Sequence, residues 1–111
     1  MDDDAMRACA QHCNDCHLAC VETARHCLER GGAHAQPDHV ALLLTCADIC
    51  ATSARALLRG VHEHVHTCRA CAAICRACAE SCAAMADDDP AMQRCADACN
   101  ACADSCERMA A

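Results

Sequence analysis

The sixteen cysteines of this 111-residue chain recur at helical spacing, and this recurrence limits the possible folds more than any other feature. Within each of four segments, successive cysteines are three, four or seven residues apart. Those are the steps between positions a and d of a heptad, which share one stripe of an α-helix. Each segment therefore predicts a helix with its cysteines facing a shared interior. The cysteines are Cys9, Cys13, Cys16, Cys20, Cys27, Cys46, Cys50, Cys68, Cys71, Cys75, Cys78, Cys82, Cys95, Cys99, Cys102 and Cys106.

Residues that end or begin helices separate the four segments. Gly31-Gly32, Gly60 and the run 87–90 are breaks, and Pro37 and Pro90 suit the first turn of the helix that follows. The connections are short, so sequential helices are antiparallel. We expect an all-α, up-down-up-down four-helix bundle with a cysteine-lined core, forming a single domain of residues 1–111. The expected helices are about residues 5–30, 38–59, 61–86 and 90–109.

The composition indicates that sulfur takes the place of an ordinary apolar core. The chain has no Phe, Tyr or Trp, although aromatic rings normally contribute much of the burial in a core. Free cysteine can act as a small buried hydrophobe, so a purely structural role is one alternative. Leu and Ile would fill such a core better and would carry no risk of oxidation. Sixteen cysteines on shared stripes therefore favour metal ligands.

A disulfide scaffold is a second alternative, because many cysteines in a short chain often indicate an oxidising compartment. The acidic run 1–4 does not resemble a secretory signal, and we see no run of transmembrane length, so we expect a cytoplasmic protein with no membrane partner. Cβ atoms one helical turn apart are about 5–6 Å apart, and a disulfide needs about 3.5–4.5 Å. Bridging metal ions suit the helical gap better.

Charge favours Cu(I) among the metals that thiolate selects. Sixteen thiolates without metal would change the net charge from −7 to about −23. Four Zn(II) ions with four thiolates each would leave the core at about −8, whereas Cu(I) replaces thiol protons close to one for one and leaves the core near neutral. The net charge and the lack of a basic patch also argue against nucleic acid as a partner.

The same stripes continue into residues that can bind Cu(I) at both ends of the bundle. Thioether and imidazole are weaker and more exchangeable ligands than thiolate, as an entry point requires. Methionine can equally fill gaps in the end layers, and that alternative stays open. One end is predicted to hold Met6, His64 and Met109, and the other His39, Met85 and Met92.

The sequence indicates no metal role for other residues near the stripes. The acidic residues 87–89 are explained by helix capping and the helix dipole. Four stripe positions are non-ligands: Leu43, Ser53, Leu57 and Val61. Five histidines lie beside the stripes or are expected to face solvent: His12, His17, His26, His62 and His66.

The pattern ACAQHCNDCHLAC, CADIC, CRACAAICRACAESC and CADACNACADSCERM resembles the bacterial copper storage proteins, specifically their cytosolic branch, over essentially the whole chain. The resemblance implies a bundle that binds many Cu(I) ions through all sixteen cysteines, and a homotetramer. It also implies a core mouth with His and acidic groups near the connection between the third and fourth helices. That connection has no histidine here, so Met85, Met92 and His39 would serve, with Leu43 where an acidic residue is expected.

Three functions follow from these patterns. The leading interpretation is storage of multiple Cu(I) ions for supply or detoxification, with a copper chaperone or exchange ligand as a further partner and no enzymatic activity. The second is a general thiolate buffer for zinc or cadmium, like a metallothionein. The third is a redox thiol protein, suggested by CxxC pairs, but such pairs usually accompany a βαβ pattern that is absent here. The CxxC pairs are Cys13/Cys16, Cys68/Cys71, Cys75/Cys78 and Cys99/Cys102.

Overall fold

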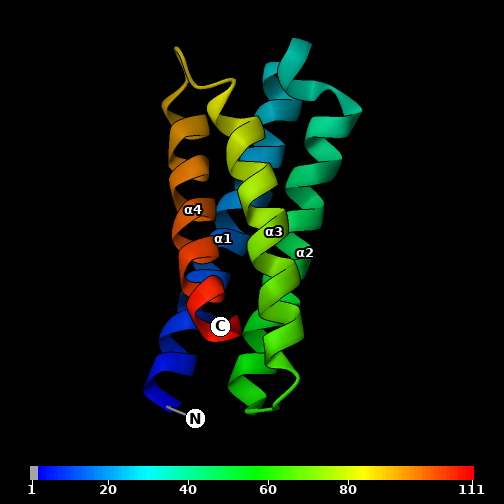
Figure 1. Ribbon diagram of the computed structural model, residues 1–111. Helices are drawn as coiled ribbons and strands as arrows, with labels where there is room; N and C mark the ends of the chain where they lie inside the picture. The colour runs from blue at the N-terminus through cyan, green and yellow to red at the C-terminus, as the bar shows by residue number, and fades with distance from the viewer. Residues whose placement is uncertain (1–2) are drawn as a thin grey trace.

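The computed structural model describes residues 3–111 as an elongated antiparallel bundle of 45 × 20 × 17 Å (Figure 1). Each helix packs against two neighbours: α1 and α3 both contact α2 and α4. The predicted all-α four-helix bundle is confirmed, while Met1 and Asp2 of the acidic run lie outside the described residues. The helices are α1 (Asp3–Arg30), α2 (Pro37–Arg59), α3 (His64–Ala83) and α4 (Pro90–Ala110), and a short 3-10 helix, η1 (Gly32–Ala35), joins α1 to α2.

The helix boundaries follow the predicted breaks in three places. Pro37 and Pro90 both lie in the first turn of their helices. Gly60 ends α2 with a left-handed backbone (φ 72°), a conformation that costs glycine no Cβ clash. Asp89 precedes α4, and its carboxylate accepts the Ala91 N–H at 3.1 Å. This contact is the N-cap that the sequence predicted.

The third helix is shorter than predicted at both ends. It begins at His64 rather than Val61, because the chain makes a turn after Gly60 and the Val61 carbonyl accepts the His64 N–H at 3.2 Å. Val61 is 39% exposed, so its assignment to the core stripe was wrong. At the other end the helix stops at Ala83, and residues 84–89 form turns that carry the chain to α4.

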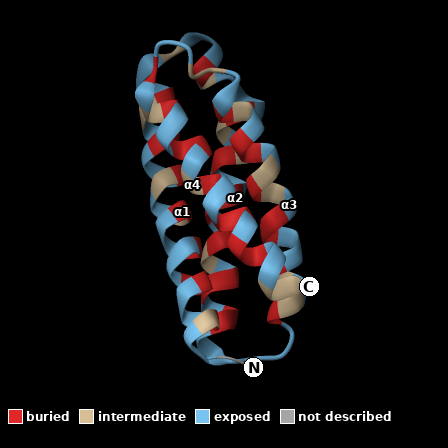
Figure 2. Ribbon diagram, turned by 60° about the vertical axis from the view of Figure 1, so that its left-hand side comes forward, coloured by how far each residue is buried: buried red, intermediate tan, exposed pale blue. Residues whose placement is uncertain are grey.

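The interior of the bundle is made of cysteine and alanine. All sixteen cysteines are at most 1% exposed, and Figure 2 shows buried positions running along the facing sides of the helices. Leu43, Ser53 and Leu57 are buried on α2, as their stripe positions predicted. Small Ala side chains beside the cysteines, including Ala47 and Ala96, let the backbones approach closely.

Helix α2 is the one described helix that is long and apolar enough to cross a membrane by length and composition. The sequence reading had found no such run. Half of the most apolar 18-residue stretch of α2 is buried inside the bundle. The helix supplies His39, Leu43, Cys46 and Cys50 to the core. Core helices commonly pass the same test, so this apolarity is accounted for by packing against α1 and α3.

Candidate metal centre

The sixteen cysteine side chains are all buried in the interior of the bundle, and we call them the sulfur column. Its Sγ atoms approach one another within helices and between them, as in the pairs Cys16–Cys20 at 3.9 Å and Cys50–Cys75 at 3.6 Å. All sixteen are free thiols. Two metal–sulfur bonds of about 2.3 Å span up to about 4.6 Å, so a bridging ion fits such pairs with little movement.

Twelve of the cysteines fall into overlapping groups whose Sγ atoms lie within 4.8 Å of one another. The groups share members, and each combines three helices, so these twelve cysteines form a continuous set of sites rather than a series of isolated ones. Shared sulfurs can bridge neighbouring ions. The groups are Cys13/Cys71/Cys102/Cys106, Cys16/Cys46/Cys50/Cys75, Cys16/Cys20/Cys46/Cys99, Cys50/Cys71/Cys75/Cys102 and Cys9/Cys68/Cys106.

The remaining cysteines continue the column toward the connection between α3 and α4. Hydrogen bonding with Cys78 and Cys95, together with burial, raises the pKa of the Cys82 thiol. Cys27 lies last, and burial, followed by the negative charge of Asp89, raises its pKa to about 11. Cys27 and Cys82 are therefore neutral in the metal-free protein at ordinary pH.

Cys27 is in contact with three neutral ligands that exchange more readily than thiolate. Its Sγ lies 3.4 Å from His39 Nε2, 3.6 Å from Met92 Sδ and 3.8 Å from His34 Nδ1. We call these four residues the Cys27 mouth. His39 Nδ1 pairs with Ser81 Oγ at 2.7 Å, which orients the ring, and burial lowers the pKa of His39. A neutral imidazole is the form that binds metal.

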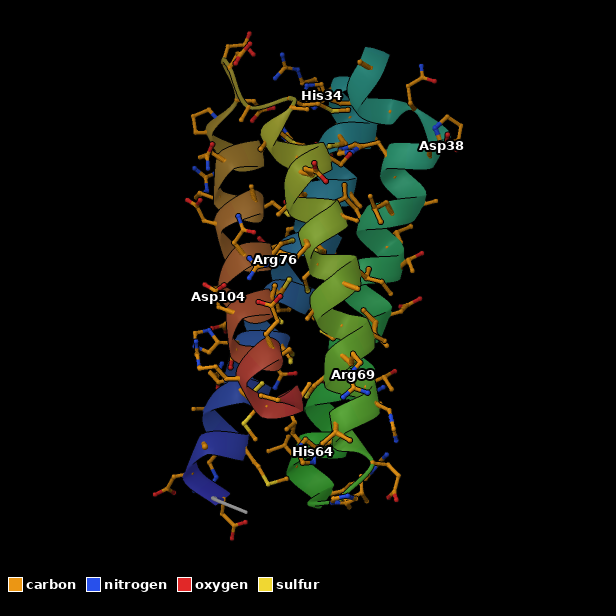
Figure 3. The ribbon with its side chains drawn as sticks, in the orientation of Figure 1. His34, Asp38, His64, Arg69, Arg76 and Asp104 are labelled. Carbon is orange, nitrogen blue, oxygen red and sulfur yellow. The ribbon has the colours of Figure 1, made fainter. Side chains whose placement is uncertain are left out.

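The residues predicted at this end do not all contact Cys27. It brings His39 and Met92 into contact with Cys27, whereas Met85 is half-buried and packs against the core. The sequence reading missed His34, which lies on η1 at the top of Figure 3. Its spacing of seven residues from Cys27 was a usable signal, but Gly31 and Gly32 interrupted the predicted helix between them.

The buried carboxylate of Asp89 lies beside the Cys27 mouth, 4.0 Å from His34 Nδ1. Asp89 Oδ2 accepts hydrogen bonds from His26 Nε2 and Arg30 Nη1, both at 2.7 Å. These contacts, led by the one from His26, hold the pKa of Asp89 well below its usual range. His26, which received no role from the sequence, thus joins the end of α1 to the start of α4. Asp89 supplies the acidic group expected near this connection, in addition to its predicted capping role.

The opposite end of the column has a different composition. Cys9, Cys68 and Cys106 form its last sulfur group, and Ser53 Oγ lies 3.5 Å from Cys68 Sγ. The predicted end residues are all nearby: Met6 and His64 are buried and Met109 is half-buried.

The other histidines lie outside the column. His17 uses Nδ1 to donate to the Ala47 carbonyl at 2.8 Å, a contact that links α1 to α2. His12, His62 and His66 are exposed. Exposure agrees with the solvent-facing positions that the sequence predicted for His62 and His66.

A family model described as copper storage protein matches residues 2–111. The chain is 41% identical to the Nmul_A1745 protein from Nitrosospira multiformis (TM-score 0.90; 98% of this chain and 97% of that one). It is 37% identical to a Cu(I)-bound copper storage protein, BsCsp3 of Bacillus subtilis (TM-score 0.87; 96% and 99%). It is 29% identical to a cytosolic copper storage protein from Streptomyces lividans with five coppers (TM-score 0.91; 98% and 94%). A comparison with curated protein sequences finds no match.

Proposed function

Because the chain belongs to the copper storage protein family, we propose that it stores many Cu(I) ions on the sixteen thiolates of the sulfur column and exchanges them through the Cys27 mouth. The observation that supports this most strongly is the continuity of the column. Contacting Sγ atoms of the grouped cysteines lie 3.6 to 4.0 Å apart, as in Cys13–Cys106 and Cys50–Cys102. An ion bound in one of these groups has a further thiol pair close by.

The electrostatics of the column favour Cu(I) over Zn(II). Each Cu(I) that replaces one thiol proton leaves the buried interior uncharged, whereas four Zn(II) ions bound by sixteen thiolates leave about −8. Uncompensated charge in an interior with no water is costly. The neutral thiols of the metal-free bundle also pack as apolar groups, so the empty store folds before it is loaded.

The Cys27 mouth is the proposed exchange site because its ligands weaken toward solvent. Cys27 offers a thiolate, His34 and His39 offer imidazoles, and Met92 offers a thioether. Imidazole and thioether release Cu(I) more readily than thiolate does. Arg30 pairs with both Asp88 and Asp89, so the two carboxylates leave net negative charge beside this route, which attracts an incoming cation. Met85 is a further candidate ligand, half-buried and packed against the core.

We also propose a cellular location, a role and an oligomeric state for the protein. We place the store in the cytosol, where thiols stay reduced, as the description of the Streptomyces lividans relative suggests. Its role is supply or detoxification, with a copper chaperone or exchange ligand as donor or acceptor and without catalysis. Exposed Leu18, Leu28 and Leu44 on α1 and α2 support a homo-oligomer, for which resemblance suggests a tetramer.

The test is an anaerobic titration of the reduced protein with Cu(I) against a chromogenic chelator. Uptake of about one copper per thiol at high affinity supports the store. Saturation at a few ions, or easy loss of copper to the chelator, contradicts it. The same titration repeated with Zn(II) present separates the alternatives, because a zinc buffer retains Zn(II) when Cu(I) is limiting. A thiol–disulfide exchange assay tests the redox alternative.

A further inference from the structure

His64 lies at the end of the bundle opposite the Cys27 mouth and has an unusual environment for a histidine. Its side chain is fully buried at the start of α3, and Figure 3 shows it at the opposite end from His34. Its Nε2 is the one buried side-chain nitrogen or oxygen among residues 3–111 that has no hydrogen-bond partner. A buried polar atom left without a partner costs about 1–3 kcal/mol.

The other ring nitrogen determines the chemical state of His64. Nδ1 lies 2.8 Å from the Val61 carbonyl, which can only accept a hydrogen bond, so Nδ1 carries the proton. Nε2 then has a free lone pair. An imidazole that donates from one nitrogen to a backbone carbonyl and offers the other to an ion is the usual arrangement of a metal-ligating histidine.

The sulfur column supplies a second ligand on the same face of α3. His64 and Cys68 are four residues apart, so their side chains lie on adjacent turns. Cys68 belongs to the terminal group with Cys9 and Cys106. By the zinc values, one metal–nitrogen and one metal–sulfur bond together span up to about 4.3 Å. A thiolate too distant to hydrogen-bond Nε2 can therefore still share an ion with it.

We propose that His64 Nε2 and the Cys68 thiolate hold a terminal Cu(I) that closes the sulfur column at this end. The site rests on the proposed storage function and extends it. One thiolate, one neutral imidazole and one Cu(I) sum to zero charge, so full burial is tolerated. Because His64 and Cys68 are both 0% exposed, whereas His39 and His34 at the Cys27 mouth are 5% and 8% exposed, this copper is retained longest when the store is emptied.

The experiment follows the histidine nitrogens of the wild-type protein during anaerobic Cu(I) loading, by long-range ¹H–¹⁵N correlation. We expect the His64 Nε2 resonance to shift as copper binds, while Nδ1 keeps its proton. His17 is the internal control, because it makes the same Nδ1 contact with a carbonyl but lies outside the column. An unchanged His64 Nε2 at full loading overturns the proposal. If the protein still takes up copper tightly, only this site fails and the storage function is unaffected.

A matched pair of variants tests the site by stoichiometry. Asn can replace the Nδ1–H donor to Val61 but has no nitrogen in the position of Nε2, so His64→Asn should bind about one Cu(I) fewer. His17→Asn should keep the full count. A full count in His64→Asn, with slow release of the last copper unchanged, refutes the terminal site. Should His64→Asn not fold, the wild-type nitrogen measurement still decides.

Discussion

Loading the column with Cu(I) should displace protons in a ratio that the structure determines. All sixteen thiols are buried, and desolvation disfavours charged thiolates without a metal ion, so we expect the metal-free column to start protonated. If the interior stays neutral, each Cu(I) releases about one proton and release ends near sixteen protons for sixteen coppers. Four Zn(II) ions would instead release about four protons each.

The assay is an anaerobic titration in weakly buffered solution, with Cu(I) added as its acetonitrile complex and protons counted by a pH-stat. Cys50→Ala serves as the control, because the loss of one thiol from the middle of the column should lower the total by one proton. Two protons per copper, ending at about eight coppers, would mean a core carrying about −8 and would refute the neutrality argument. Far fewer than one proton per copper would show that the thiols were already ionised.

Three further predictions follow from the same structure. The metal-free protein should show a helical circular dichroism spectrum, and Cu(I) should raise its unfolding free energy by about 2.7 kcal/mol for one site at a free concentration of one hundred times Kd, measured in melts with and without copper. A random-coil spectrum would contradict the folded empty store. The pKa of Cys27 is higher in the folded protein, about 11 against an ordinary 9.0, so its contribution to stability is complete below about pH 9 and is lost as pH rises toward 11. Urea unfolding of the metal-free protein at about pH 8 and about pH 10.5 should show the decline. Leu43→Ala removes a fully buried side chain that offers no ligand, and it should cost about 2–5 kcal/mol of stability while the copper count stays unchanged. A reduced count in this variant would mean that packing on α2, beyond the thiols themselves, determines capacity.

Several parts of the molecule could be predicted from sequence because they depend on local repetition. The stripe of Cys68, Cys71, Cys75, Cys78 and Cys82 follows directly from the pitch of an α-helix, and the breaks follow from the backbone preferences of Gly and Pro. The error at Val61 has the same origin. The heptad spacing continues past Gly60 in the sequence, but the left-handed backbone of Gly60 turns the chain away from the helix.

Other features depended on contacts between segments distant in the chain. Asp89 was recognised as a cap, but its bonds to His26 and Arg30 join residues about sixty positions apart. His34 was missed because it reaches Cys27 from a 3-10 turn rather than along a helix. No repeat in the sequence predicts contacts of this kind.

The sequence by itself determined the four helices, the sulfur-lined face of each and the preference for a soft monovalent ion, because helical spacing and charge depend only on residue order and type. Only the tertiary structure decided which thiols share an ion, that Cys27 meets two imidazoles and a thioether, and that His64 is buried with one nitrogen unpaired. The physical reason is that these properties depend on how helices approach one another and exclude water, and distances between helices are set by packing rather than by spacing along the chain.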